Sequence, residues 1–458
     1  MLQCALVHGA SPLAPATSLH QPRTAPRWPR GGCVGYHRQP NPARAVAQDS
    51  RRTTVPDEIF SRLKVIDCGS YVAGPAAATV LADFGASVVK IEPLTGDPLR
   101  MLAPVYPSYF WRMDARSKKG LAIDLKRPEG REALERLVRD CDIFLTNYRT
   151  SLIDRLDLSY ETLKSLKPTL IYAHVTGYGE RGDESERTAF DATAWWGRSG
   201  LQDWVRASEN VPAGNSPGMG DHATAMSLFA AIMAALYRRS ETGQGSKVHT
   251  SLLANGAWSH SMSIQAAAAG AKWAIHHPQQ RPDAVHLNKV YTTADDRFLM
   301  LNVLNHEKEY GPLLASLGLA ELKKDPRFTD VRTAFSNMAD FVPYIDSAIA
   351  ALTLEDVRAR FDAHGITYGH VQRTVEALTD PQMRANDVMV DVADPREEWE
   401  QTVASPIWID GIDKVPPRCA PEIGEHNAEV LESVGYSDAE IEALAQAGVI
   451  GTHVGPLR

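Results

Sequence analysis

The chain has 458 residues, more than one compact core usually holds, so two domains are expected. Hydrophobic residues make up 44% and charged residues 23%, which is the balance of a globular enzyme. The net charge is −8 without a dense basic stripe, which argues against a nucleic-acid partner. Because no run approaches the roughly 18–20 apolar residues that cross a bilayer, we expect a soluble protein without a membrane partner.

Residues 1–55 differ in composition from the rest. The first fifty residues contain several arginines but only one acidic residue, Asp49, and prolines interrupt any helical period. The favoured interpretation is a disordered extension, or a start codon assigned too far upstream. The alternative is a transit peptide for mitochondria or another organelle, although the prolines weaken the amphipathic helix that such a peptide needs.

The cysteines are widely spaced, and no two form a CxxC pair. The sequence therefore indicates neither a zinc site nor a redox motif, and we predict no metal site. An odd number of cysteines also argues against a secreted disulfide scaffold. A reducing compartment fits best, so a cytoplasmic location is expected.

The folded region begins near Leu63 with a short apolar run, residues 63–69, that has the pattern of a buried strand. A helix is predicted over residues 75–85, with proline in its first turn and glycine at its end. Residues 87–92 form the next predicted strand. A strand–helix–strand unit of this length predicts parallel pairing with a right-handed crossover.

Strands are also predicted over residues 120–125, 142–148 and 169–179, with an amphipathic helix over residues 128–141. The alternation predicts an α/β fold: a large domain, residues 56–265, with a Rossmann-like open parallel sheet. Ligands of such sheets bind at the carboxyl ends of the strands. The loops at residues 69–74 and 147–150 emerge there.

The pattern changes near Lys289. Residues 290–305 predict two strands around a tight turn, followed by helical stretches and by further strand around residues 388–393. These features predict a smaller α+β domain over residues 289–394. Residues 266–288 form the predicted linker into it.

Gly177, Gly179 and Gly182 spell GxGxxG after a predicted strand. In a dinucleotide site this motif opens a helix directly, so that the pyrophosphate meets the helix N-terminus. Here an acidic loop follows, which would repel phosphates. The motif is interpreted as a turn, and a nicotinamide enzyme is poorly supported.

Residues 223–237 are almost all small or apolar, which predicts a helix buried on most of its circumference. Asp221 stands at the start of this helix, beyond Gly218 and Gly220. Aspartate is a preferred N-cap, and most residues of this kind do nothing else. However, a helix N-terminus stabilises an ionised carboxylate, flanking glycines let a substrate approach, and an accessible carboxylate can act as a nucleophile. Spacing alone leaves both roles open and favours the cap.

Four long segments carry a family resemblance: VAGPAAATVLADFGASVVKIEP, LAIDLKRPEGREALERLV, GMGDHATAMSLFAAIMAALYRRSETGQGSKV and APEIGEHNAEVLESVGYSDAEIEALAQAGVI. Together they resemble the class III CoA-transferases, which include formyl-CoA:oxalate and carnitine CoA-transferases, with α-methylacyl-CoA racemases as relatives. The match runs in order from Leu63 to Ile450. It implies an enzyme that moves CoA from an acyl-CoA donor to a carboxylic acid.

The resemblance assigns Asp221 as the catalytic nucleophile. In the family this aspartate attacks a thioester and forms an acyl–aspartyl anhydride. The CoA thiolate then forms an aspartyl–CoA thioester, from which the acceptor acid takes CoA through a second anhydride. CoA thioesters are therefore substrates, and no permanently bound cofactor is implied.

The resemblance also implies CoA contacts at Val72, Ala73, Lys126, Asn147, Tyr148 and Arg155. Lysine and arginine suit the phosphates of CoA. The oxalate enzymes carry an arginine where this chain has Pro93, and their tetraglycine loop has no visible counterpart. These departures argue against oxalate or formate as a substrate.

The family further implies an intertwined homodimer in which the C-terminal segment, residues 395–458, returns to the large domain. Residues 189–201 resemble the corresponding stretch in transferases that act on aryl and 2-hydroxy acids. Trp195 and Trp196 in that stretch either line an acyl pocket or belong to the core, and core is the commoner role for paired aromatics. A medium or bulky organic acid is the expected substrate.

Two alternatives stay open. The racemases carry a histidine where this chain has Phe190, followed by Asp191, and phenylalanine cannot exchange a proton. The nearest histidine, His222, has no racemase counterpart that we can match. The second alternative, a CoA-binding protein without turnover, is favoured by nothing in the sequence.

Overall fold

The computed structural model describes residues 58–105, 107–205, 212–275, 286–392 and 400–451. The predicted extension or transit peptide at residues 1–55 lies outside these ranges, as do residues 276–285 of the predicted linker.

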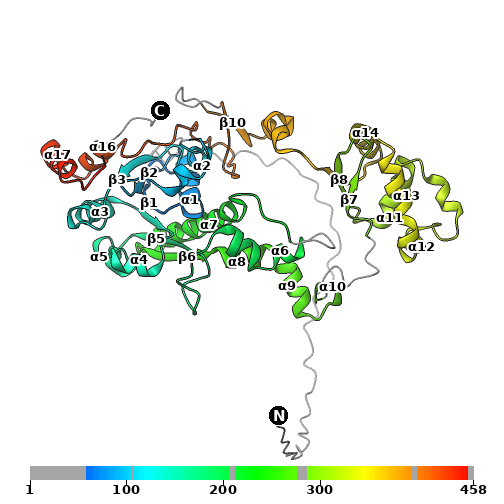
Figure 1. The fold of residues 1–458 in the computed structure, drawn as a ribbon, viewed down its shortest axis with the longest axis horizontal. Helices are drawn as coiled ribbons and strands as arrows, with labels where there is room; N and C mark the ends of the chain where they lie inside the picture. Colours follow the sequence, from blue (N-terminus) through cyan, green and yellow to red (C-terminus); the bar gives the residue numbers. More distant parts are fainter. Residues whose placement is uncertain (1–57, 106, 206–211, 276–285, 393–399, 452–458) are drawn as a thin grey trace, which may run out of the picture. The chain divides into compact units, whose positions relative to one another are not determined.

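A six-stranded parallel sheet forms the centre of the large α/β region (Figure 1). Its strands run in the order β3-β2-β1-β4-β5-β6, which is the Rossmann order. The prediction of an open parallel sheet is confirmed. The strands are β1 (Lys64–Cys68), β2 (Ser87–Glu92), β3 (Lys119–Ala122), β4 (Ile143–Thr146), β5 (Ile171–Thr176) and β6 (Ser246–Ser251).

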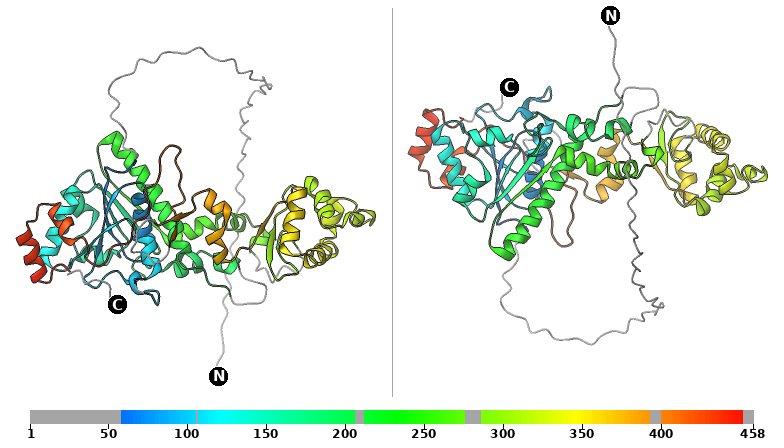
Figure 2. Two further views of the ribbon diagram at one scale, coloured as in Figure 1. Left: turned by 90° about the horizontal axis from the view of Figure 1, so that it is seen from above. Right: turned by 90° about the horizontal axis from the view of Figure 1, so that it is seen from below.

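Helices cover both faces of this sheet (Figure 2). The helices of this region are α1 (Ala73–Asp83), α2 (Tyr109–Asp114), α3 (Pro128–Asp140), α4 (Thr150–Arg155), α5 (Tyr160–Leu166), α6 (Leu201–Trp204), α7 (Met219–Thr242), α8 (Leu252–Ser259), α9 (Ser261–Ala268) and α10 (Lys272–Ile275), and α9 and α10 lie away from the sheet (Figure 1). Val65 and Leu145 point to the core that α1 and α7 share. Their neighbours Ile66 and Phe144 point to the opposite core, with α3 and α5. Burial on both faces explains why the strands are continuously apolar.

Helix α1 starts two residues earlier than predicted. It begins at Ala73, and Pro75 occupies its first turn. Proline is tolerated there because N–H groups of the first turn have no partner within the helix. Strand β3 ends at Ala122 rather than at residue 125. Beyond this point the backbone bonds to residues near the C-terminus, since Asp124 donates its N–H to the Val449 carbonyl at 2.8 Å.

The prediction that α7 is buried on most of its circumference is wrong for this chain. Its fully buried residues lie along one stripe that faces α1 and the sheet, and Ala223, Ala230 and Ala234 are exposed. By length and composition alone α7 is apolar enough to cross a membrane, contrary to the sequence-based expectation. This is weak support for a membrane span, since core helices of globular proteins pass the same test.

A second, smaller sheet is antiparallel, in the order β7-β8-β9, and confirms the predicted change of architecture. It consists of β7 (Val290–Thr292), β8 (Phe298–Leu301) and β9 (Tyr368–His370). Its own core joins Leu299 to Leu313, Phe341 and Phe361 of the nearby helices. Those around it are α11 (His306–Ser316), α12 (Val331–Ser336), α13 (Met338–Ala350) and α14 (Leu354–His364).

The C-terminal part begins with α15 (Pro381–Ala385) and a hairpin of β10 (Met389–Asp391) and β11 (Gln401–Val403). It ends with α16 (Asn427–Glu432) and α17 (Asp438–Gln446), which pack on the large sheet. The Asn427 side chain accepts a hydrogen bond from the Ala122 N–H at 2.9 Å. The C-terminal residues thereby cover β3, which would otherwise be an open sheet edge.

Candidate active site

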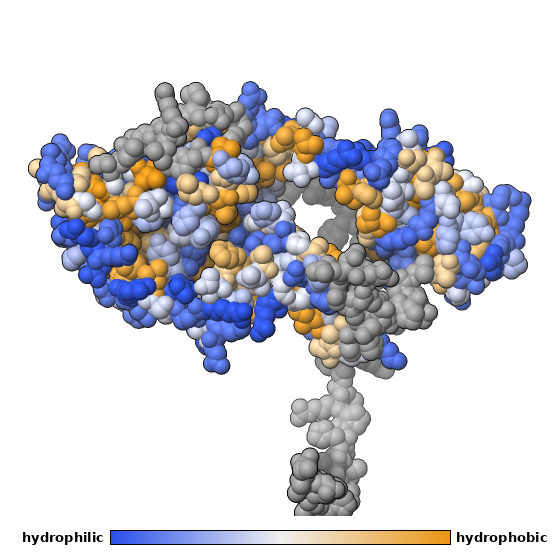
Figure 3. Space-filling view, viewed as in Figure 1, coloured by the Kyte–Doolittle hydropathy of each residue, from blue (hydrophilic) through white to orange (hydrophobic). Residues whose placement is uncertain are grey.

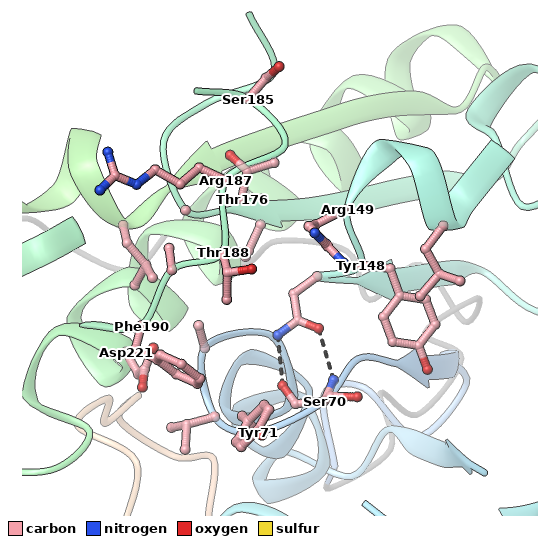
Figure 4. Close-up of a pocket in the computed structure, with 18 residues that line it drawn as sticks. Ser70, Tyr71, Tyr148, Arg149, Thr176, Ser185, Arg187, Thr188, Phe190 and Asp221 are labelled. Carbon is pink, nitrogen blue, oxygen red and sulfur yellow. Dashed lines mark hydrogen bonds between the residues drawn. The ribbon is translucent and has the colours of Figure 1, made fainter. Parts of the chain in front are cut away.

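A cavity of about 260 Å³ opens at the carboxyl ends of β1, β4 and β5 (Figure 4). Residues after β1, residues after β4, the end of β5, Ser185, residues 187–190 and Asp221 line it. This is the place where the strand order of a Rossmann-like sheet reverses, and ligands bind in that crevice. The loops expected to carry the site therefore do meet at one cavity.

One side chain joins the two main loops. The Asn147 side chain accepts a hydrogen bond from the Ser70 N–H at 2.8 Å and donates one to the Ser70 carbonyl at 2.7 Å (Figure 4). A side-chain amide bonded in this two-point manner fixes the spacing between the loops. Asn147 thus shapes the cavity through the backbone of Ser70.

Buried charges hold the loop after β1 from below. The Lys90 ammonium donates to the Gly69 carbonyl at 2.5 Å and lies 3.2 Å from Asp97 Oδ2. Burial disfavours its charged form, but Asp67, Asp97 and Glu92 outweigh this and raise the pKa of Lys90. Asp97 in turn accepts a hydrogen bond from the Tyr71 N–H at 3.2 Å. The loop that lines the cavity is thus anchored to a paired charge inside the protein.

Asp221 is the third residue of α7, so it is not the N-cap that the sequence favoured. Gly218 takes the N-cap position with a φ of 74°, where glycine is favoured. At Gly220, an added Cβ would lie 2.6 Å from the Trp195 ring. The glycines therefore serve backbone geometry and packing, and their role in letting a substrate approach Asp221 stays a prediction.

Trp195 and Trp196 belong to the core. Their rings stack with centroids 6.0 Å apart, and both side chains are buried among residues of α1 and α7. Among the described residues that line the cavity, neither tryptophan is present. Of the two roles left open by the sequence, the structure supports packing, with Trp195 seated on the first turn of α7.

A second carboxylate, Asp191, lies close to Asp221. It precedes α7 in the chain, at the start of the π-helical turn η2 (Asp191–Gly197), and is buried. Its Oδ2 accepts hydrogen bonds from the Gly220 N–H at 3.2 Å and from the Asn215 side chain at 2.9 Å. Asp191 therefore accepts a hydrogen bond from one of the free backbone N–H groups at the N-terminus of α7.

Burial and the charge of Asp191 raise the pKa of Asp221 to about 7. The helix N-terminus, expected to stabilise the ionised form, does not offset these effects, because the side chain is buried and because Asp191 occupies a free N–H of that terminus and repels a second negative charge. Near neutral pH, Asp221 is thus present in both its neutral and its ionised form.

His222 provides the opposing charge. Its Nε2 lies 3.0 Å from Asp114 Oδ1, which is buried at the end of α2. Burial lowers the pKa of His222, but the hydrogen bond and charge of Asp114, together with Asp221, raise it overall. The positive imidazolium lowers the pKa of Asp221 and so partly offsets Asp191.

The sequence-predicted CoA residues are only partly brought together. The cavity that Asp221 lines also contains Val72, Ala73, Asn147 and Tyr148. Lys126 lines a second cavity of about 460 Å³ that shares Ser70, Tyr148 and Leu152 with the first. Arg155 is exposed in the last turn of α4 and lies among the residues of neither cavity in the described part of the chain.

Sequence reasoning missed several lining residues. Tyr71 and Arg149 lie in the two loops already singled out, so their position at strand ends was the available signal. Arg187 follows a turn that we interpreted as a failed dinucleotide motif, and no pattern marked it. Within the described ranges, no group of three or more His, Cys, Asp or Glu residues is arranged to hold a metal ion.

The chain belongs to CoA-transferase family III, whose family model matches residues 60–427. It is 31% identical over 394 residues to cinnamoyl-CoA:phenyllactate CoA-transferase of Clostridium sporogenes, covering 84% of this chain and 96% of that protein. It is 28% identical over 401 residues to (R)-2-hydroxy-4-methylpentanoate CoA-transferase of Clostridioides difficile, covering 86% and 99%.

The crystal structure of a CAIB/BAIF family protein from Brucella suis has the same fold. The TM-score is 0.71 at 24% identity, and the likeness covers 81% of this chain and 98% of that protein. Together with the family match, these relatives confirm the resemblance drawn from the sequence. The protein is a CoA-transferase, with CoA thioesters as substrates.

The charge pairing at Asp221 predicts a titration that needs no substrate. Asp191→Asn removes the nearby negative charge, so the pKa of Asp221 should fall from about 7 by roughly one pH unit. Infrared difference spectra between each protein and its Asp221→Asn counterpart isolate the carboxyl band of protonated Asp221. This band should disappear at a lower pH in the Asp191→Asn background.

Asp183→Asn is the matched control, because Asp183 is exposed on the preceding loop. It removes the same charge and should leave the band unmoved. An unchanged titration in the Asp191→Asn background would contradict the assignment of Asp191 as the neighbour that raises the pKa.

Proposed function

We propose that this CoA-transferase works by covalent catalysis at Asp221. The observation that carries the proposal is a carboxylate with a pKa of about 7 in a cavity at the carboxyl edge of the sheet. Its ionised oxygen attacks the thioester carbon, the carbon–sulfur bond breaks, and CoA leaves as a thiolate. The product on the enzyme is an acyl–aspartyl anhydride.

The remaining steps return Asp221 to its starting form. The thiolate attacks the Asp221 carbonyl carbon, forming an aspartyl–CoA thioester and releasing the donor as a carboxylate. The acceptor carboxylate attacks the same carbon, forms a second anhydride and expels the thiolate. That thiolate attacks the acceptor acyl carbon, giving the new acyl-CoA and free Asp221.

Electrostatics favour these steps. Both the anhydride and the thioester of Asp221 are neutral, so their formation moves the negative charge from Asp221, where burial and Asp191 disfavour it, to the CoA thiolate or the released carboxylate. A carboxylate with a raised pKa is also a stronger nucleophile than an ordinary one. His222 keeps part of the Asp221 population ionised near neutral pH, which attack requires.

For CoA itself we propose a path along the two joined cavities. Val72 and Ala73, which the family resemblance places near the adenine, line the first cavity with Asn147 and Tyr148, and Lys126 in the second cavity suits a phosphate group. Arg155 belongs to this proposal at the exposed surface. The shared lining of the cavities supports a single extended ligand.

We also propose the intertwined homodimer and the cytoplasmic location. Support for the dimer comes from large apolar side chains at the surface of α8 to α10: Trp258 is 80%, Met262 86% and Trp273 50% exposed. Figure 3 shows hydrophobic patches on the drawn face. Surfaces of this kind are typical of regions that associate with another chain.

Replacing the nucleophile tests the chemistry. Asp221→Asn should lower kcat by at least about 10⁴-fold, because the amide cannot form the anhydride. With acyl-CoA present, hydroxylamine should convert Asp221 of the unaltered enzyme into a hydroxamate that peptide mass spectrometry detects. Asp183→Asn is the control and should keep normal turnover.

Stability measurements show whether the variant is folded. The pKa of Asp221 is raised from 3.8 to about 7, so folding favours the protonated form, and this contribution to stability is lost as pH rises through about 7. Asp221→Asn should therefore be more stable than the unaltered enzyme above that pH. Near-normal turnover in the folded variant would refute Asp221 as the nucleophile.

A substrate panel tests the expected acid class. With acetyl-, succinyl- and aryl-CoA donors, medium or bulky organic acids should accept CoA better than oxalate. The reason is Pro93, which stands where the oxalate enzymes carry an arginine. Activity confined to formyl-CoA and oxalate would contradict this expectation.

The rival reaction is racemisation, which needs two proton-exchanging groups on opposite sides of the α-carbon. Phe190 lines the cavity but cannot exchange protons. His222 is bonded to Asp114, and Asp191 to Gly220 and Asn215. We predict no epimerisation of 2-methylacyl-CoA and no deuterium at its α-carbon in deuterated water. Deuterium uptake that depends on Asp221 would favour the racemase.

A further inference from the structure

Two aromatic side chains contact each other in the wall of the Asp221 cavity (Figure 4). The rings of Tyr71 and Phe190 meet edge to face, with centroids 5.5 Å apart and planes at 88°. Tyr71 comes from the loop after β1, and Phe190 directly precedes η2. The two rings therefore close the cavity from opposite loops at the end where Asp221 lies.

Tyr71 adopts a backbone conformation that bulky residues avoid. Its φ is 59°, in the left-handed region that favours glycine. The hydrogen bond from its N–H to Asp97 holds it there, and Asp97 pairs with Lys90. Such outliers persist where the surroundings enforce them, and they gather at ligand sites. Glycine would suit this backbone better, so the tyrosine is explained by what its ring contacts.

Phe190 is 49% exposed and lines the cavity. Its position is fixed by the next residue, since Asp191 is bonded to the Gly220 N–H in the first turn of α7. The ring is thus held in a set relation to Asp221. A ligand body that covered it would bury apolar surface and stabilise the complex.

The cations of the same cavity are already engaged elsewhere. Arg187 pairs with Glu184 at 2.5 Å, and Arg149 donates to the Glu186 carbonyl at 3.4 Å. At the aromatic end the neighbouring charges are the carboxylates of Asp221 and Asp191 together with His222, whose positive charge is paired with the carboxylate of Asp114. A second carboxylate on the acyl chain would be repelled there, whereas an apolar or aromatic body would not.

We propose that Tyr71 and Phe190 form the acyl-recognition wall and select acyl groups with an aromatic or branched apolar body over small or dicarboxylic ones. This proposal rests on the proposed function, in which the thioester carbon sits at Asp221. The acyl group extends from that carbon and contacts the ring faces and edges that the pair leaves open.

The test measures donor preference at the first chemical step. Hydroxylamine inactivates the enzyme when it attacks the Asp221 carbonyl carbon of the anhydride or of the aspartyl–CoA thioester, which forms the Asp221 hydroxamate and releases the donor carboxylate or CoA. The second-order rate constant of inactivation with each acyl-CoA therefore ranks the donors. The probes are 3-phenylpropanoyl-CoA, acetyl-CoA and glutaryl-CoA. The unaltered enzyme should react fastest with 3-phenylpropanoyl-CoA. Phe190→Leu and Tyr71→Leu should each reduce its preference over acetyl-CoA roughly tenfold.

Tyr344→Leu is the control, because Tyr344 is an exposed aromatic on α13 and should leave the ranking unchanged. Phe190 is half exposed, so its replacement leaves the core intact, and thermal unfolding checks this. The proposal is overturned if acetyl-CoA or glutaryl-CoA reacts fastest, or if both leucine variants keep the original ranking. Absence of inactivation by every donor would instead refute Asp221 as the acylated residue.

Discussion

The active-site loops depend on a group of buried charged side chains that form ion pairs with one another. Lys118 and Lys90 both lie close to Asp67, at 2.9 and 3.6 Å, and all three side chains are fully buried. Breaking one such pair leaves an uncompensated charge without water, which is strongly destabilising. Lys90 donates a hydrogen bond to the Gly69 carbonyl in the loop after β1, and Lys118 donates one to the Asp114 carbonyl at 2.8 Å. Because Asp114 holds His222, this network sets both the cavity wall and the positive charge near Asp221.

At Asp221 the structure balances opposing effects. Burial and Asp191 favour the neutral acid, whereas the imidazolium of His222 favours the carboxylate. A residue that alternates between a charged and an acylated state benefits from such a balance, because neither state is excessively stable. The same arrangement sacrifices some stability above neutral pH for reactivity, as strained or charged sites commonly do. Gly220 in the first turn lets Trp195 and Asp191 approach closely enough to create this balance.

The sequence predicted the sheet well, because buried parallel strands have continuous apolar runs; β2 matches its predicted ends. It failed where distant segments decide the outcome. Strand β3 ends early because Asp124, just beyond it, donates its N–H to the Val449 carbonyl. The exposed alanines of α7 cannot be distinguished from its buried alanines by composition. Asp221 came from family resemblance, since its spacing favoured a cap. The pairing of His222 with Asp114, 108 residues apart, carries no local signal.

The most direct test of the account follows an oxygen atom. In the proposed sequence the acceptor carboxylate supplies the bridging oxygen of the second anhydride, and that oxygen remains on Asp221 when the thiolate attacks the acceptor acyl carbon. After turnover with an acceptor acid labelled by a heavy oxygen isotope in its carboxylate, peptide mass spectrometry should find the label in the Asp221 carboxyl group. Turnover that leaves Asp221 unlabelled, or labels another carboxylate, would contradict covalent catalysis at this residue.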